Sequence, residues 1–224
     1  MKKSDMKICE LYSLEHTMAK PLLEEYEYPW EVLPRIGEFI RKLGESLPKT
    51  EYDNPMEGIW IHKTAKVAPT AGIIAPVIIG PAAEIRHCAF IRGKAIIGAG
   101  AVVGNSTELK NVILFDNVQV PHYNYVGDSV LGYKAHMGAG SITSNVKSDK
   151  KLVKVHGEDG DIETGMKKFG AMIGDEVEVG CGSVLNPGTV IGKNTNIYPL
   201  SSVRRCVDAY SIYKNQGEIA VKEE

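Results

Sequence analysis

The sequence predicts an all-β fold, a parallel β-helix of short strands and tight turns, preceded by a short helical segment. The first observation is a period of six, since every sixth residue from Ile61 to Leu109 is isoleucine, valine or leucine. The second is a companion column two residues earlier, mostly of alanine and ending at Thr107. The third is the return of the same period from Ile173 to Val203, again with small residues two positions before.

A period of six fits neither an amphipathic helix nor a half-buried strand, whose periods are about 3.6 and two residues. In a β-helix each hexad supplies a strand and a turn, so the aliphatic side chain stacks inward and the small one fits the corner. Because such a stack cannot be buried in fragments, we expect residues 59–206 to form one domain and residues 207–224 a tail. The ladder comprises Ile61, Val67, Ile73, Ile79, Ile85, Ile91, Ile97, Val103 and Leu109, then Ile173, Val179, Leu185, Ile191, Ile197 and Val203.

The period breaks in two places. In the first, two steps of five residues interrupt the steps of six, and His122 lies between these two shorter steps. The second break is an insertion over residues 146–168, which is polar, contains six lysines and has no inward ladder. A loop of this length in a compact domain is usually functional or mobile. The ladder across the first break is Leu109, Leu114, Val120, Val126, Leu131 and Met137.

Residues 1–58 show a different pattern. Trp30, Leu33, Ile36 and Ile40 recur at helical spacing, which predicts a helix in this segment. We interpret the segment as a helical cap on the open end of the solenoid, which solenoids need for solubility. The alternative is an arm for dimerisation or partner docking.

The composition excludes several classes of protein. With 26 basic and 28 acidic residues the net charge is -2, so nothing indicates nucleic-acid binding. The first residues lack the apolar core of a signal peptide, and no apolar run approaches the length of a membrane span. The four cysteines are far apart with no CxxC pair, which predicts reduced thiols in a cytoplasmic protein and no zinc site built on them.

His122 is the first candidate for chemistry. In the segment VPHYNYVGDS it stands with two tyrosines and an amide, and a neutral imidazole is a suitable general base that a phenol or amide can orient. A lone histidine in a β-protein is more often structural, and this alternative stays open. Arg92 and Lys110 are separated by three hexads, which is one full coil. This spacing places them one coil apart on the same face, where they could hold a phosphate or carboxylate.

The motifs of the second half of the chain resemble a known family. The run KNVILFDNVQVPHYNYVGDSVLGYKAHMGAGSITSNVKSDKK, followed by GAMIGDEVEVGCGSVLNPGTVIG, is similar to the C-terminal acetyltransferase domain of bifunctional glucosamine-1-phosphate acetyltransferase/UDP-N-acetylglucosamine pyrophosphorylases. The archaeal-type sugar-1-phosphate nucleotidylyltransferases that carry this domain resemble it most, over about residues 85–203. The resemblance implies a left-handed β-helix, because the hexapeptide pattern marks that fold, whose members are usually trimers.

The resemblance also implies roles for individual residues. The histidine at the position of His122 is the family's catalytic base, and the tyrosine matching Tyr125 contacts the sugar phosphate. The family's phosphate-binding arginine and lysine fall on Arg92 and Lys110. Further acceptor-site residues fall on Asn145, Lys151 and Lys154. His136 departs from the pattern, since bacterial members have an asparagine there that helps to orient the acceptor, and this leaves the acceptor's identity open.

The function that follows is an acetyl-CoA-dependent N-acetyltransferase of an amino-sugar 1-phosphate such as glucosamine 1-phosphate, a reaction of UDP-N-acetylglucosamine biosynthesis. Acetyl-CoA is the co-substrate, no metal is required, and the backbone around Ala139 and Gly140 binds the reacting thioester. We expect a cytoplasmic homotrimer that binds neither nucleic acid nor membrane. Arg204, Arg205 and Lys214 are candidates for the CoA phosphates, although a solvated tail explains them equally well.

Two alternatives remain. The chain could be a non-enzymatic trimeric module that partners a separate sugar nucleotidylyltransferase, because the segment before the solenoid is too short to hold such a domain. It could also be a zinc-dependent carbonic anhydrase, an activity that this fold supports. That alternative requires three histidines that converge at a subunit interface. His87, His122 and His136 are available, but the close H-x-x-x-x-H pair expected there is absent.

Overall fold

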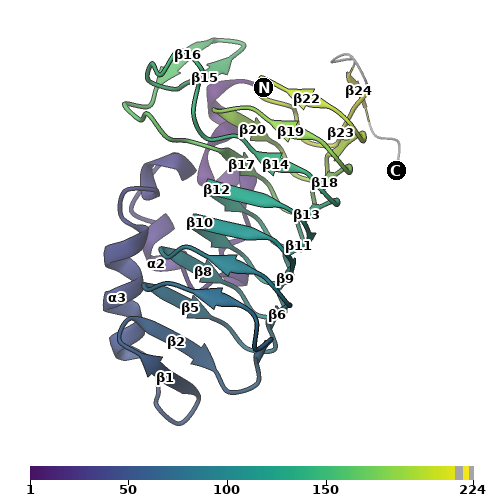
Figure 1. Ribbon diagram of the computed structural model, residues 1–224. Coiled ribbons are helices and arrows are strands. Elements are labelled where there is room, and N and C mark those ends of the chain that lie inside the picture. Colours follow the sequence, from purple (N-terminus) through teal and green to yellow (C-terminus); the bar gives the residue numbers. More distant parts are fainter. Residues whose placement is uncertain (215–218, 222–224) are drawn as a thin grey trace.

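The computed structural model describes residues 1–214 and 219–221. It confirms the predicted fold class, because the chain is a left-handed parallel β-helix of about nine turns with a few short helices. Figure 1 shows the strands stacked along one axis, with the helices along one side of the stack. Among the described residues, no helix is both long enough and apolar enough to cross a membrane.

The larger sheet has 13 strands, most of them paired in parallel. Its main path is β1 (Tyr52–Met56), β2 (Ile59–His62), β5 (Val77–Ile79), β8 (Ala95–Ile97), β10 (Glu108–Leu114), β12 (Tyr125–Leu131), β14 (Ile142–Thr143), β19 (Val184–Leu185) and β22 (Ser202–Val203). Beside this path lie β4 (Gly72–Ile73), β7 (Phe90–Ile91), β17 (Ala171–Ile173) and β20 (Thr189–Ile191).

The second sheet has nine strands. In spatial order they are β3 (Lys66–Val67), β6 (Glu84–Ile85), β9 (Val102–Asn105), β11 (Gln119–His122), β13 (His136–Met137), β18 (Glu178–Val179), β21 (Asn196–Ile197), β23 (Ser211–Tyr213) and β24 (Ile219–Val221). β23 pairs in parallel with β21, so this part of the expected tail continues the sheet. Residues 215–218 and 222–224 of that tail lie outside the described residues.

The strand register reproduces the period of six and its two breaks. Lys66 pairs with Glu84 and Glu84 with Val102, and each of these steps spans three hexads. Val102 pairs with Gln119, a step that is one position shorter, because the first short step of the ladder removes a residue from this coil. The inward residues from Ile79 to Leu109 are at most 1% exposed. Burial of each such side chain stabilises the fold by about 1.5–3 kcal/mol.

The helical segment covers a side of the solenoid, which corrects the expected end cap. Its elements are η1 (Lys3–Met6), α1 (Ile8–Leu11), η2 (Leu14–His16), α2 (Lys20–Leu23), η3 (Pro29–Val32) and α3 (Ile36–Ser46). Helix α3 packs on β5, β8 and β10, and the Trp30 ring lies 5.7 Å from the Phe169 ring. The expected helical region also ends in a strand, since β1 pairs antiparallel with β2. The helical segment packs on the side of the solenoid, and not on its end, because Ile36 and Ile40 bury their side chains against a surface that is itself apolar.

The insertion at residues 146–168 is partly ordered as a hairpin. Strands β15 (Lys154–Gly157) and β16 (Gly160–Glu163) pair antiparallel. Val153 and Val155 are fully buried, which anchors the insertion to the body of the protein. Figure 1 shows the hairpin projecting near the end of the solenoid that carries β20 and β22.

Candidate functional site

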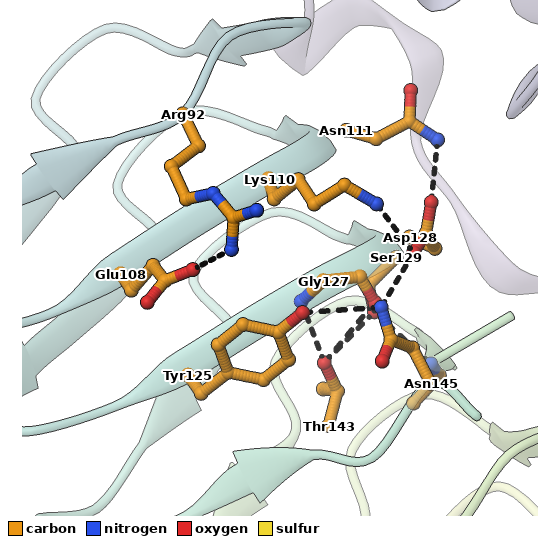
Figure 2. A network of polar contacts seen from close by, with 11 residues as sticks. Arg92, Glu108, Lys110, Asn111, Tyr125, Gly127, Asp128, Ser129, Thr143 and Asn145 are labelled. Atoms are coloured by element: carbon orange, nitrogen blue, oxygen red, sulfur yellow. Dashed lines mark hydrogen bonds and ion pairs between the residues drawn. The ribbon is translucent and has the colours of Figure 1, made fainter. Parts of the chain in front are cut away.

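A buried carboxylate, Asp128, forms the centre of a polar network at the corner where β10 and β12 bend (Figure 2). Its Oδ2 accepts a hydrogen bond from Asn145 at 2.6 Å and lies 3.4 Å from the Lys110 ammonium. Its Oδ1 accepts one from Asn111 at 2.9 Å. Asn111 and Asp128 both have left-handed backbone conformations, with φ of 54° and 48°, and they stack on adjacent coils. The corner geometry therefore brings three donors to one carboxylate.

Tyr125 joins this network through Asn145, which donates a hydrogen bond to the phenol oxygen at 3.1 Å. Burial raises the pKa of the Tyr125 phenol, while the hydrogen bond from Asn145 acts in the opposite direction. The phenol is therefore neutral near pH 7 and can donate a hydrogen bond. Gly127 makes this contact possible, because a Cβ at that position would lie 2.5 Å from the Tyr125 oxygen.

Arg92 and Lys110 lie on the same face, as their spacing predicts (Figure 2). Each already has an acidic partner. Arg92 is paired with Glu108 at 2.5 Å, and this hydrogen bond raises the pKa of the guanidinium. Lys110 faces Asp128. The face therefore presents two cations, each beside a carboxylate, rather than an isolated positive patch.

His122 lies at the end of β11, beyond a corner from this network. Its backbone pairs with Asn105 of the preceding coil, and its side chain is exposed. In the described part of the chain, no hydrogen bond reaches its imidazole, so the ring is available to a substrate. The carbonyl of His122 accepts a hydrogen bond from the Gly140 amide at 3.0 Å. The candidate base thus lies beside the turn Gly138–Ser141.

That turn supports only part of the expected thioester site. The Gly140 amide is used by His122, and the Gly138 amide donates to the Val179 carbonyl. The Gly140 amide is therefore already engaged, and the assignment of Ala139 and Gly140 to the thioester stays a prediction. Within residues 1–214 and 219–221 the Ala139 amide donates to no protein group, so it can face a substrate oxygen.

The structure does not bring His136, Lys151 and Lys154 into the Asp128 network. The His136 ring lies 2.7 Å from a Glu178 carboxylate oxygen, one strand further along the second sheet. Lys151 is exposed on the insertion, and Lys154 is paired with Glu163 within the hairpin. Lys154 instead lines a cavity of about 850 Å³ between the insertion and the last coil, which Lys147, His156, Arg204 and Arg205 also line.

Sequence reasoning missed Glu108, Asn111 and Asp128. Glu108 could have been found, because it is two positions before Lys110 in a strand and so projects from the same face. Asp128 stands in the segment YVGDS, but its importance depends on the corner. Asn111 has no signal in the sequence, since its amide meets Asp128 only because of the left-handed bend.

The structure gives no support to a zinc site. His87 contacts the Thr70 hydroxyl at 2.9 Å, and His136 contacts Glu178. Across the described residues, no three histidine, cysteine, aspartate or glutamate side chains are grouped so that they could hold a metal ion. His87, His122 and His136 therefore do not converge within one chain.

Fold and site together define a hexapeptide-repeat β-helix protein with a network of charged and polar side chains on one face, and comparison with known proteins narrows the class of protein. Residues 73–167 match the family model of the GMPPB C-terminal domain. A bifunctional protein GlmU from Methanococcus maripaludis is 29% identical over 217 residues, which cover 96% of this chain and 53% of that protein. A bifunctional sugar-1-phosphate nucleotidylyltransferase/acetyltransferase from Sulfurisphaera tokodaii is 34% identical over 125 residues, 56% of this chain and 31% of that protein.

These matches confirm the resemblance that the motifs predicted: the chain is similar to the C-terminal acetyltransferase-type domain of the bifunctional GlmU proteins. It spans about half the length of the first of these relatives. Among solved structures, a hexapeptide transferase family protein from Anaplasma phagocytophilum is 16% identical with a TM-score of 0.42, over 74% of this chain and 80% of that one.

Proposed function

We propose that the chain is an acetyl-CoA-dependent N-acetyltransferase of an amino-sugar 1-phosphate. The observation that carries this proposal is the network in which Lys110 and Asn145 contact Asp128 and Asn145 also contacts Tyr125. Arg92 lies on the same face (Figure 2). Two cations and a neutral phenol suit a phosphorylated sugar, since charge-assisted hydrogen bonds to phosphate are strong and directional. The name of the Sulfurisphaera relative, which includes both sugar 1-phosphate and acetyltransferase, supports the same substrate class.

The acceptor phosphate would bind to Arg92 and Lys110, whose side chains Glu108 and Asp128 hold on this face. Tyr125 and Asn145 would orient the sugar. We also assign His136, Lys151 and Lys154 to acceptor binding, which requires a movement of the insertion or the approach of a second copy, because they lie away from the network in one chain. A homotrimer, in which neighbouring copies complete the site, supplies this second copy.

The reaction needs one acyl transfer and two proton transfers, one from the acceptor nitrogen and one to the leaving thiolate. His122 takes a proton from the neutral acceptor amine as its nitrogen attacks the thioester carbonyl. The C–S bond then breaks, the acetyl group remains on nitrogen as an amide, and the leaving CoA thiolate takes the proton from His122 and departs as the thiol. The free Ala139 amide can donate a hydrogen bond to the carbonyl oxygen as negative charge develops there. No covalent enzyme intermediate is required.

The test is release of CoA thiol when the protein is incubated with acetyl-CoA and glucosamine 1-phosphate. We expect His122→Ala to lower kcat by about 100 to 10,000-fold, the usual contribution of a general base, with an unchanged circular dichroism spectrum. His62→Ala is the matched control, because this histidine lies on β2, away from the Asp128 network, and its ring nitrogen contacts the Thr64 hydroxyl at 2.9 Å. Thiol release by the wild-type protein that persists in His122→Ala would refute the assignment of the base. Binding of the acceptor without any turnover would favour the non-enzymatic module.

A further inference from the structure

Asn124 is a buried amide beneath the corner that separates His122 from Tyr125. Its side chain is 3% exposed, and both of its polar atoms have hydrogen-bond partners. The side-chain oxygen accepts a hydrogen bond from the His122 backbone amide at 3.0 Å. The side-chain nitrogen donates to the Gly138 carbonyl at 2.8 Å and to the Ser141 carbonyl at 3.1 Å. One amide therefore connects the segment of the candidate base to both ends of the Gly138–Ser141 turn.

Asn124 is also an exception in its own column. The small inward positions of the other coils are occupied by Ala89, Thr107, Ser141, Ser183 and Ser201, all of them buried and shorter than asparagine. In this column Ser183 and Ser201 satisfy their hydroxyls on the carbonyl of Tyr198. A serine at this position is thus sufficient for a coil of this solenoid to form. The larger amide occurs at the coil that carries His122.

We propose that Asn124 is a positioning residue that fixes His122 relative to the Gly138–Ser141 turn, and this rests on the proposed function. The base and the Ala139 amide must act on the same tetrahedral centre, so their separation controls the rate. The two groups come from adjacent coils. They are joined by the hydrogen bond from Gly140 to the His122 carbonyl, and Asn124 supplies the other bonds across the same gap. A shift of about 1 Å between reacting groups is enough to cost about 100-fold in rate.

Asn124 also reaches the acceptor side. The backbone carbonyl of Asn124 accepts a hydrogen bond from the backbone amide of Glu108 at 2.9 Å. The backbone amide of Asn124 donates a hydrogen bond to the Thr107 hydroxyl at 3.3 Å. These backbone contacts do not depend on the side chain. A substitution at Asn124 is therefore expected to release the base and the turn while leaving the Arg92–Glu108 face in place.

The variant that tests the proposal is Asn124→Ser, since serine already occupies this column at other coils. We expect kcat to fall by about tenfold or more, with the KM values for acceptor and acetyl-CoA within about threefold of wild type. In the His122→Ala background the same substitution should change kcat by less than about twofold, because there is no base left to position. Ser183→Ala, which removes a buried hydroxyl from the same column two coils further along the solenoid, is the matched control and should leave kcat unchanged.

An independent readout is hydrogen exchange of the backbone amides of His122 and Gly140. We expect both to exchange at least about tenfold faster in Asn124→Ser than in wild type, and Ser183→Ala to leave them unchanged. Full kcat in Asn124→Ser, or an equal fall with and without His122, would overturn the proposal. If the wild-type protein releases no thiol, the proposed function fails, and the exchange rates alone decide whether Asn124 holds the two segments together. Unchanged exchange would then refute that role as well.

Discussion

At the scale of single residues, Asp128 is the group that holds the proposed acceptor face together, since it contacts Lys110, Asn111 and Asn145. Asp128→Asn would remove the charge beside Lys110 and place an amide donor against the donor of Asn111 or Asn145. We expect the KM for the acceptor to rise by about tenfold, because Lys110 and Asn145 lose the carboxylate that positions them. The KM for acetyl-CoA should be unchanged, since we assign the thioester to the turn at residues 138–141. An unmatched buried donor costs about 1–3 kcal/mol of stability. Steady-state kinetics with each substrate varied in turn would measure the effect.

The control for that variant is Asp175→Asn. Asp175 is a buried corner aspartate like Asp128, but it accepts hydrogen bonds from the backbone amides of Ser13 and Tyr133. Its substitution should lower the free energy of unfolding by a similar amount and leave both KM values as they are. An equal rise in acceptor KM in the two variants would show that the effect of Asp128→Asn is only structural.

The residues of the site differ in how far the sequence could reveal them. Arg92 and Lys110 follow from spacing, since residues one coil apart on a regular solenoid must share a face. Glu108 and Asp128 are the acidic partners of these two cations. Their ion pairs could not be predicted, because residue spacing does not determine the direction in which a side chain points. Lys154 was assigned to the acceptor by resemblance, whereas the hairpin pairs it with Glu163. Contacts made by an insertion depend on its own fold, which has no repeat to reveal it.

At the scale of elements, the helical segment is part of the core and not an attachment to it. The helical spacing identifies which side of α3 is apolar, but it does not say which surface of the solenoid that side meets. Ile40 is fully buried and belongs to the same hydrophobic cluster as Ile78 and Val112 of the sheet. The end-cap prediction failed because the period of six identifies only the residues that face the inside of the solenoid. It does not show that one outer side of the solenoid is also apolar.

This arrangement predicts the behaviour of Ile40→Ala. Truncation of a buried isoleucine in a shared core should lower the free energy of unfolding by about 2–5 kcal/mol. The loss should appear in one cooperative urea transition, because α3 cannot leave without exposing the sheet. The exposed neighbour gives a matched control, Lys42→Ala, which should change stability by less than about 0.5 kcal/mol. A separate early transition in Ile40→Ala, with the solenoid still folded, would contradict a shared core.

At the scale of the whole molecule, the coils of the solenoid could be predicted from the period of six, whereas the left-handed sense was implied by the family resemblance. A solenoid repeats one local structure, so each hexad specifies its own strand and turn, and three hexads make one coil. Both the regular register between coils and the shortened one at Gln119 follow from the ladder. The same repetition makes stability collective, since each coil buries its inward residues only against its neighbours. Poor packing between two neighbouring coils therefore lowers the stability of the whole solenoid.

Gly104→Ala tests this collective stability. A Cβ at Gly104 would lie 1.5 Å from the carbonyl oxygen of Pro121 on the next coil, a backbone atom that cannot move unless the coils separate. We expect a loss of more than about 4 kcal/mol, at the extreme of single substitutions, seen as a large fall in Tm by circular dichroism. Gly37→Ala is the matched control, because its Cβ would meet only the flexible Lys94 side chain and alanine favours helix α3 by up to about 1 kcal/mol. Since Pro121 precedes His122, a folded Gly104→Ala protein with wild-type Tm would show that these coils do not pack as closely as the candidate active site requires.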